Sequence, residues 1–188
     1  GEGTAEALTK ANNGFMHSVQ VHGPLGKELT AQFGVYGDGK SAVLEMSSAS
    51  GLPLLKEEER NPMLTSTYGT GEIIADALHR GCRKFLAGIG GSATNDAGMG
   101  MLSALGYRFL DSEGNVLEGK GESLAKVRSI DDSSVEKYLL ESEFIIACDV
   151  DSPFCGREGA AYVYGPQKGA TPEMIEALDA GMKHFAEL

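Results

Sequence analysis

The sequence predicts an α/β fold: a mixed sheet with helices, including a small antiparallel meander near the N-terminus. From residue 15 to 46, short strand-forming runs are separated by the turn-forming sequences H-G-P-L-G-K and Y-G-D-G-K, which favours antiparallel hairpins. After residue 68, short apolar runs alternate with apolar residues at helical spacing, which is typical of a parallel or mixed sheet. The 188 residues are enough to bury a core, and we expect one α/β domain over residues 1–188.

Individual helices and strands are predicted from capping residues and apolar spacing. Helices are expected at about 4–12, 73–80, 97–105 and 133–140, with a last helix that begins at Thr171 and Pro172. Strands are expected at 85–87, 107–111 and 144–150. The run F-I-I-A-C-D-V from 144 to 150 is almost continuously apolar, which indicates a strand buried on both faces.

Residues 34–41, G-V-Y-G-D-G-K-S, match the pattern of an ATP-binding P-loop. That loop needs a strand before it and a helix after it, because the helix N-terminus receives the phosphates. The residues that follow, A-V-L-E-M, favour a strand instead. We therefore predict that Gly37, Asp38 and Gly39 reverse a hairpin.

The stretch A-G-I-G-G-S-A-T-N-D at 87–96 joins a predicted strand to the first turn of a helix. Glycine allows a ligand to approach the backbone closely, and the N–H groups at a helix N-terminus favour an anion. Short polar side chains follow the glycines in this stretch, and one carboxylate ends it. The candidate ligand contacts are Gly90, Gly91, Ser92, Thr94, Asn95 and Asp96.

Three other positions are candidates for the same site. A second glycine- and hydroxyl-rich helix start, T-S-T-Y-G-T-G at 65–71, contains Thr70. Asp149 falls at the carboxyl end of a predicted strand, where ligands bind in parallel sheets. Lys168 is the cation of the glycine-rich segment Y-G-P-Q-K-G-A and could offset the charge of a phosphate.

The composition restricts the partners and the compartment. With 27 acidic against 16 basic residues the formal net charge is −11, which argues against binding to nucleic acid or to an anionic membrane. No apolar run reaches the length that spans a membrane. The three cysteines, Cys82, Cys148 and Cys155, lack the spacing of a zinc site or a disulfide framework, so we expect a reducing, cytoplasmic location.

Three functions are compatible with the glycine loop. Gly88 to Ala93 fits the dinucleotide fingerprint G-x-G-x-x-A, and Asp111 follows at about the distance of a ribose-binding acid, which indicates an oxidoreductase domain. The carboxylate of Asp96 at the end of the loop instead favours phosphoryl transfer beside a divalent metal. A non-catalytic module that only binds an anion is the third alternative.

Several separate segments resemble the signature sequences of the bacterial glycerate kinase family. From the start of the chain, these segments are the opening G-E-G-T, then Y-G-T-G-E-I-I, G-I-G-G-S-A-T-N-D-A-G-M-G, A-C-D-V-D-S-P-F-C-G and Y-G-P-Q-K-G-A. They follow one another in the same order as in the family. The resemblance extends over essentially the whole chain. The family's N-terminal P-D-S-x-K segment and its C-terminal G-A-G-A-A-G-G and G-E-G-R-x-D blocks are absent, so we expect an internal fragment.

The resemblance implies a function and a missing partner. It implies ATP-dependent phosphorylation of D-glycerate with Mg²⁺, with 2-phosphoglycerate as the favoured product. It further implies that residues 1–188 are the inserted domain of a two-domain α/β kinase whose Rossmann-like domain is absent, so we expect no turnover by the fragment alone. Asp96 and Asp149 are then the expected catalytic residues, as Mg²⁺ ligands or by orienting the glycerate hydroxyl. Whether the protein forms a homo-oligomer is left open.

Overall fold

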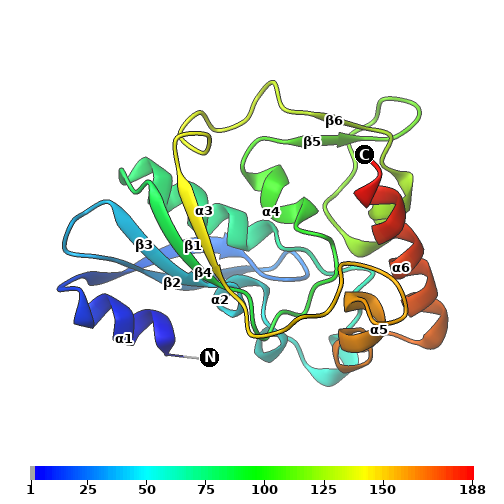
Figure 1. The fold of residues 1–188 in the computed structure, drawn as a ribbon, viewed down its shortest axis with the longest axis horizontal. Helices are drawn as coiled ribbons and strands as arrows, with labels where there is room; N and C mark the ends of the chain where they lie inside the picture. Colours follow the sequence, from blue (N-terminus) through cyan, green and yellow to red (C-terminus); the bar gives the residue numbers. More distant parts are fainter. Residues whose placement is uncertain (1–2) are drawn as a thin grey trace.

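The computed structural model describes residues 3–188 and contains a five-stranded mixed sheet flanked by helices (Figure 1). The strands are β1 (Phe15–His22), β2 (Glu28–Val35), β3 (Ser41–Glu45), β4 (Lys84–Gly88) and β7 (Glu143–Ala147), in the spatial order β1-β2-β3-β4-β7. The first three are antiparallel, and β3, β4 and β7 are parallel. The predicted mixed sheet and N-terminal meander are therefore confirmed.

The turn between β2 and β3 explains why the P-loop pattern has no phosphate-binding role here. Asp38 accepts hydrogen bonds from the N–H groups of Lys40 and Ser41, at 2.8 and 2.9 Å, and Gly39 has a φ of 65°. Such a side-chain-to-backbone pattern stabilises a tight turn. The segment reverses a hairpin, as predicted.

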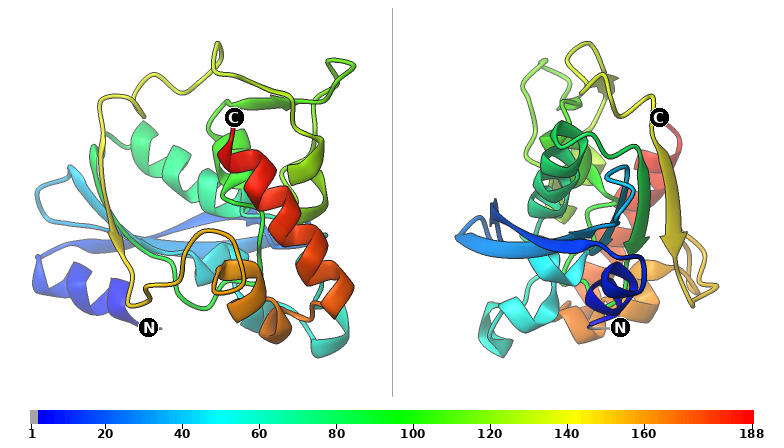
Figure 2. Two further views of the ribbon diagram at one scale, coloured as in Figure 1. Left: turned by 45° about the vertical axis from the view of Figure 1, so that its right-hand side comes forward. Right: turned by 90° about the vertical axis from the view of Figure 1, so that its left-hand side faces the viewer.

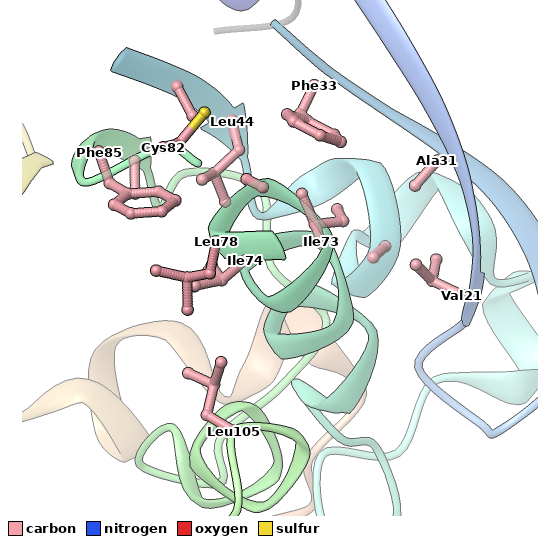
Figure 3. Packing of buried hydrophobic residues seen from close by; sticks show 14 residues of the cluster. Val21, Ala31, Phe33, Leu44, Ile73, Ile74, Leu78, Cys82, Phe85 and Leu105 are labelled. Carbon is pink, nitrogen blue, oxygen red and sulfur yellow. The ribbon is translucent and has the colours of Figure 1, made fainter. Parts of the chain in front are cut away.

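The helices α3 (Tyr68–His79) and α1 (Thr4–Ala11) pack on opposite faces of the sheet (Figure 2). On the α3 face, Phe33, Leu44 and Phe85 from three strands contact Ile73 and Leu78 of the helix and form the first core (Figure 3). On the other face, Gly34 lies directly under Thr9 of α1, and a Cβ atom at this position would overlap the threonine hydroxyl. The first helix thus covers β1 to β3.

A second core lies beside the sheet and is built from short elements. Met99, Phe109, Leu124 and Leu178 are fully buried in it. It is formed by residues of α4 (Met99–Ala104), β5 (Arg108–Leu110), η3 (Gly121–Lys126), α5 (Ala160–Tyr164) and α6 (Pro172–Ala186). The short elements β6 (Ser129–Asp131) and η4 (Pro166–Lys168) adjoin these in the chain. Strands β5 and β6 pair with each other in a separate two-stranded antiparallel sheet. The remaining short helices are α2 (Ser47–Ser50), η1 (Leu52–Leu54) and η2 (Glu57–Glu59).

Two sequence predictions are wrong. Residues 133–140 form irregular turns rather than a helix, because the segment bonds to its neighbour: Glu136 N–H donates to the carbonyl of Leu105 at the end of α4, at 2.9 Å. Strand β7 is not buried on both faces, because in the described part of the chain it pairs only with β4 and lies at the edge of the sheet. Ile145 is 57% exposed and Ile146 is 51% exposed.

Candidate functional site

The glycine loop after β4 lies against the segment that follows β3. Leu52 N–H donates to the carbonyl of Gly91 at 2.9 Å, and Ala93 N–H donates to the carbonyl of Ser50 at 2.8 Å. Gly91 has a φ of 72°, a conformation that glycine adopts without strain. Within residues 3–188, the N–H groups of Gly90 and Gly91 donate to no protein acceptor. These two amides are therefore available to a ligand.

An open pocket of about 540 Å³ lies at the carboxyl ends of β3, β4 and β7. This is the end of a parallel sheet where ligands bind. Gly90 and Gly91, whose amides are free, line this pocket together with Thr4, Ala5 and Leu8 of α1. The wall consists of Thr4, Ala5, Leu8, Val43, Leu44, Glu45, Ser47, Pro53, Leu86, Gly88, Gly90, Gly91, Ala147, Cys148 and Asp149.

Two carboxylates belong to the pocket wall, Glu45 and Asp149. Asp149 was predicted from its position after a strand, whereas Glu45 was missed, although it ends β3 just as Gly88 ends β4 and could have been found by the same reasoning. Glu45 accepts a hydrogen bond from Thr4 N–H at 3.1 Å, which ties α1 to the pocket. Mg²⁺ is commonly held by one or two carboxylates together with substrate phosphates, and the residues that line the pocket include two acidic side chains. Residues 3–188 contain no group of three or more acidic, histidine or cysteine side chains placed to hold a metal by themselves.

Asp96 lies below the loop, where it is 1% exposed. Its Oδ2 accepts hydrogen bonds from the N–H and the hydroxyl of Thr67, at 2.8 and 2.7 Å, and from Gly100 N–H at 3.1 Å. Its Oδ1 accepts from Gly98 N–H at 3.2 Å. Burial raises the pKa of this carboxyl, and the four donors act in the opposite direction. In this arrangement Asp96 connects the loop to the start of α3 and does not face the pocket.

Lys168 connects η4 to the back of the loop. Its Nζ donates to Ser92 Oγ at 2.9 Å and to the carbonyl oxygen of Thr94 at 2.5 Å. The residue is buried, and its desolvation lowers the pKa of the ammonium to about 8, against an opposing effect of the nearby Asp96 charge. The structure thus brings Lys168, Ser92 and Thr94 together, and none of the three is among the residues that line the pocket.

The other predicted contacts are buried in the framework around the loop. Thr70 Oγ1 is hydrogen-bonded to Ser50 Oγ at 2.8 Å, and the residue is 2% exposed. Asn95 Nδ2 donates to Met182 Sδ at 3.3 Å. Thr65 Oγ1 donates to the carbonyl of Ala93 at 2.8 Å, so the hydroxyl-rich start of α3 holds the glycine loop. Ligand-binding roles for Thr70, Thr94 and Asn95 remain predictions.

Comparison with known proteins identifies the family of the chain. The model of the glycerate kinase family matches residues 1–188. The chain belongs to the glycerate kinase family. A glycerate kinase from Haemophilus influenzae is 49% identical over 188 residues, and one from Bacillus subtilis is 48% identical over 188 residues. A protein from Escherichia coli K12 named glycerate 2-kinase is 45% identical over 188 residues.

A solved structure from the family has the same fold. The crystal structure of a glycerate kinase 2 from Salmonella typhimurium LT2 matches the whole chain with a TM-score of 0.97 at 48% identity. All of this chain is covered, but only 50% of the Salmonella chain. The same holds for the curated relatives, of which this chain covers 50% in Haemophilus influenzae and 49% in Escherichia coli. The chain therefore spans about half the length of the glycerate kinases it matches.

The dinucleotide alternative is not favoured. The fingerprint requires an acid at the end of a neighbouring strand in the same sheet, but Asp111 follows β5, which belongs to the separate two-stranded sheet. The Asp111 carboxylate accepts hydrogen bonds from the N–H groups of Glu113 and Asn115, at 2.8 and 2.9 Å, and closes a turn.

Over residues 3–188 the structure has no helix with the length and apolar character needed to cross a membrane.

Proposed function

We propose that a polypeptide containing these 188 residues transfers the γ-phosphoryl group of ATP to D-glycerate, with Mg²⁺, and forms 2-phosphoglycerate. The observation that supports this most is the pocket, which is lined by Gly90 and Gly91, whose amides are free, and by the acidic residues Glu45 and Asp149. Membership of the glycerate kinase family supports the reaction class, and the name of the Escherichia coli relative supports the product.

The reaction forms a bond between a glycerate hydroxyl oxygen and the γ-phosphorus, breaks the bond from that phosphorus to the bridging oxygen of the leaving ADP, and releases the proton of the hydroxyl. Enzymes accelerate this step mainly by positioning the reactants and neutralising charge. The amides of Gly90 and Gly91 are free donors at the start of the loop, so we assign them to bind a carboxylate or phosphate oxygen. The Lys168 ammonium group stabilises the loop through its hydrogen bonds to Ser92 and Thr94.

Glu45 and Asp149 are the carboxylates that would hold Mg²⁺. The metal, when bound, neutralises the negative charge that develops on the phosphate oxygens. Asp149 is also suited to orient the glycerate hydroxyl, because it lies in the pocket wall at the end of β7. For Asp96, a role as a metal ligand or in orienting the hydroxyl stays a prediction, and its burial supports a further role in fixing the loop.

We propose that the 188-residue chain alone does not turn over. Its pocket is open, and the chain spans half of the relatives, so the groups that bind the rest of ATP and close the pocket are expected in the other half. The other half of the polypeptide is thus the expected partner, alongside D-glycerate and ATP. The cytoplasm remains the expected location.

The test is a product analysis. A polypeptide of the relatives' full length that includes these residues is incubated with D-glycerate, ATP and Mg²⁺, and the products are identified by ³¹P NMR. We expect ADP and 2-phosphoglycerate, and no product from the 188-residue chain. Formation of 3-phosphoglycerate would overturn the proposed position of phosphorylation, and absence of any phosphoglycerate would overturn the substrate.

A further inference from the structure

Strand β7 has the properties of an internal strand but lies at the edge of the sheet. It pairs with β4 on one side, and among residues 3–188 no strand lies beyond it on the other (Figures 1 and 2). Glu143 N–H donates toward β4, to the carbonyl of Arg83 at 2.8 Å. Because successive residues of a strand alternate in direction, the backbone groups of Phe144 and Ile146 face the open side. They form an unpaired template for another strand.

Both faces of this strand are apolar and poorly covered. Ile145 lies beside Leu86 on the face that carries α1, and α1 packs mainly on β1 to β3. A shallow hollow of about 210 Å³, lined in part by Leu86 and Ile145, lies on this bare area. Ile146 is on the opposite face, where it is half exposed beyond the first core. Parallel sheets are normally covered by helices on both faces, so this part of the sheet is incomplete.

The strand also lacks the features that protect natural edges. Exposed edges usually carry lysine, proline, bulges or inward charges that prevent pairing with other strands. In the sequence E-F-I-I-A of β7, only Glu143 is charged, and it stands at the first position. In contrast, β1, at the other edge, carries polar side chains along its exposed positions, among them Ser18 and Gln20.

We propose that β7 is an internal strand of the intact protein, paired on its open side with a parallel strand from the half of the polypeptide outside residues 1–188. A helix of the same unit would cover Leu86 and Ile145. The occupant follows from length: this chain has the fold of its half of the Salmonella chain, with a TM-score of 0.97, and covers 50% of it. A second copy of this chain is the competing occupant, and its β7 would pair antiparallel by two-fold symmetry.

The consequence concerns the organisation of the protein and its site. Residues 1–188 would not be a self-contained inserted domain, because the division would pass through a sheet shared by both halves. The carboxyl end of the added parallel strand would lie beside Asp149, at the open side of the 540 Å³ pocket. The other half would therefore complete the wall of the pocket as well as the sheet. This inference does not depend on which reaction the site performs.

Amide hydrogen exchange tests the pairing. The N–H groups of Phe144 and Ile146 are followed in a full-length glycerate kinase polypeptide that includes these residues and in the 188-residue chain at low concentration. We expect exchange at least about tenfold slower in the longer polypeptide, as for amides in an internal strand. Equally fast exchange in both would overturn the proposal. So would protection in the short chain that rises with its concentration, because that result indicates a second copy.

A matched pair of substitutions gives an independent readout. In the longer polypeptide, Ile145→Lys would bury a charge under the added helix and lower the Tm by several degrees or more. The control is Ile130→Lys on β6, which is also a partly exposed isoleucine on a strand, 42% exposed. We expect the control to have little effect. An equal, small effect of both substitutions would contradict the proposed cover of β7.

Discussion

Thr67 donates both its backbone N–H and its hydroxyl to the same carboxylate oxygen of Asp96, at 2.8 and 2.7 Å. Thr67 Oγ1 also accepts a hydrogen bond from Met101 N–H at 2.8 Å. The start of α3, the end of the glycine loop and the first turn of α4 are joined by this pair. Asp96 thereby links the first core, on the α3 face of the sheet, to the second core, which lies beside the sheet.

Asp96→Ala is expected to reduce the free energy of unfolding by about 3 kcal/mol, because several buried donors lose their acceptor. Urea unfolding measures this change. Asp96→Asn retains the size and one acceptor oxygen, so a smaller loss is expected. If both variants unfolded like the wild type while the full-length enzyme lost its dependence on Mg²⁺, Asp96 would be a metal ligand rather than a structural anchor.

Substitution by alanine is expected to lower stability at Gly100 and to weaken ligand binding at Gly90. At Gly100 a Cβ atom would lie 2.8 Å from Tyr68 N and 2.9 Å from Asp96 Oδ2, so Gly100→Ala should lower the free energy of unfolding by about 2 kcal/mol or more. At Gly90 nothing lies within 4 Å of such an atom. Gly90→Ala should leave unfolding unchanged and weaken ligand binding, because the methyl group adds to the pocket wall.

Calorimetric titration of the full-length polypeptide with D-glycerate and with Mg-ATP, combined with urea unfolding, checks this pair. Unaltered affinity for both ligands in a well-folded Gly90→Ala protein would mean that neither ligand binds against Gly90. A fully stable Gly100→Ala protein would show that the helix starts of α3 and α4 are less tightly packed than described.

The burial of Lys168 predicts that the free energy of unfolding depends on pH. Because burial lowers the pKa of its ammonium from 10.5 to about 8, the folded chain releases this proton before the unfolded chain does. The contribution of Lys168 to the free energy of unfolding is therefore least favourable below pH 8 and rises between pH 8 and 10.5, by about 3 kcal/mol at most.

Urea unfolding at several pH values, for the wild type and Lys168→Met, isolates this contribution. The difference in unfolding free energy between the two proteins should move in favour of the wild type as the pH rises above 8. Lys126→Met, which changes an exposed lysine, serves as the control. A constant difference across this range would mean that the Lys168 ammonium is not desolvated.

The first core depends on Phe33, which is completely buried between the sheet and α3. Phe33→Ala is expected to cost about 4 kcal/mol of unfolding free energy, since it removes a buried ring and leaves a cavity. Phe15→Ala is the matched control, because Phe15 is 76% exposed at the start of β1, and it should change stability by less than about 0.5 kcal/mol. Equal effects in urea unfolding would contradict the described packing.

Local signals predicted the elements that are stabilised locally. The last helix begins at Thr171 as expected, and the Thr171 hydroxyl accepts the N–H of Met174 at 3.3 Å. The hairpin at Asp38 was likewise predicted from a turn whose stabilising groups are within a few residues. Capping and turn chemistry act over such short distances, so they can be recognised without knowledge of the fold.

The wrong or incomplete predictions depend on contacts between distant segments. The helix expected at 133–140 is replaced by turns that bond to α4, and its Tyr138 ring lies 4.0 Å from the Arg83 guanidinium. The apolar run of β7 predicted burial on both faces, but the strand lies at the edge of the sheet over residues 3–188, and its place in the sheet has no local signal. Within the site, the loop was predicted from its glycines, whereas the pairing of Asp96 with Thr67 joins residues 29 positions apart and has no local signal.

The most direct test of the account is the kinase activity of the full-length polypeptide with Asp149→Asn, compared with Asp151→Asn. Asp149 lies in the wall of the pocket that also holds the free amides of Gly90 and Gly91, whereas Asp151 lies two residues beyond and is outside that wall. Production of ADP with D-glycerate is measured at saturating Mg²⁺. We predict that Asp149→Asn lowers kcat/KM by at least about a hundredfold and that Asp151→Asn leaves it nearly unchanged. Wild-type activity in the Asp149→Asn enzyme would contradict the assignment of this pocket as the active site.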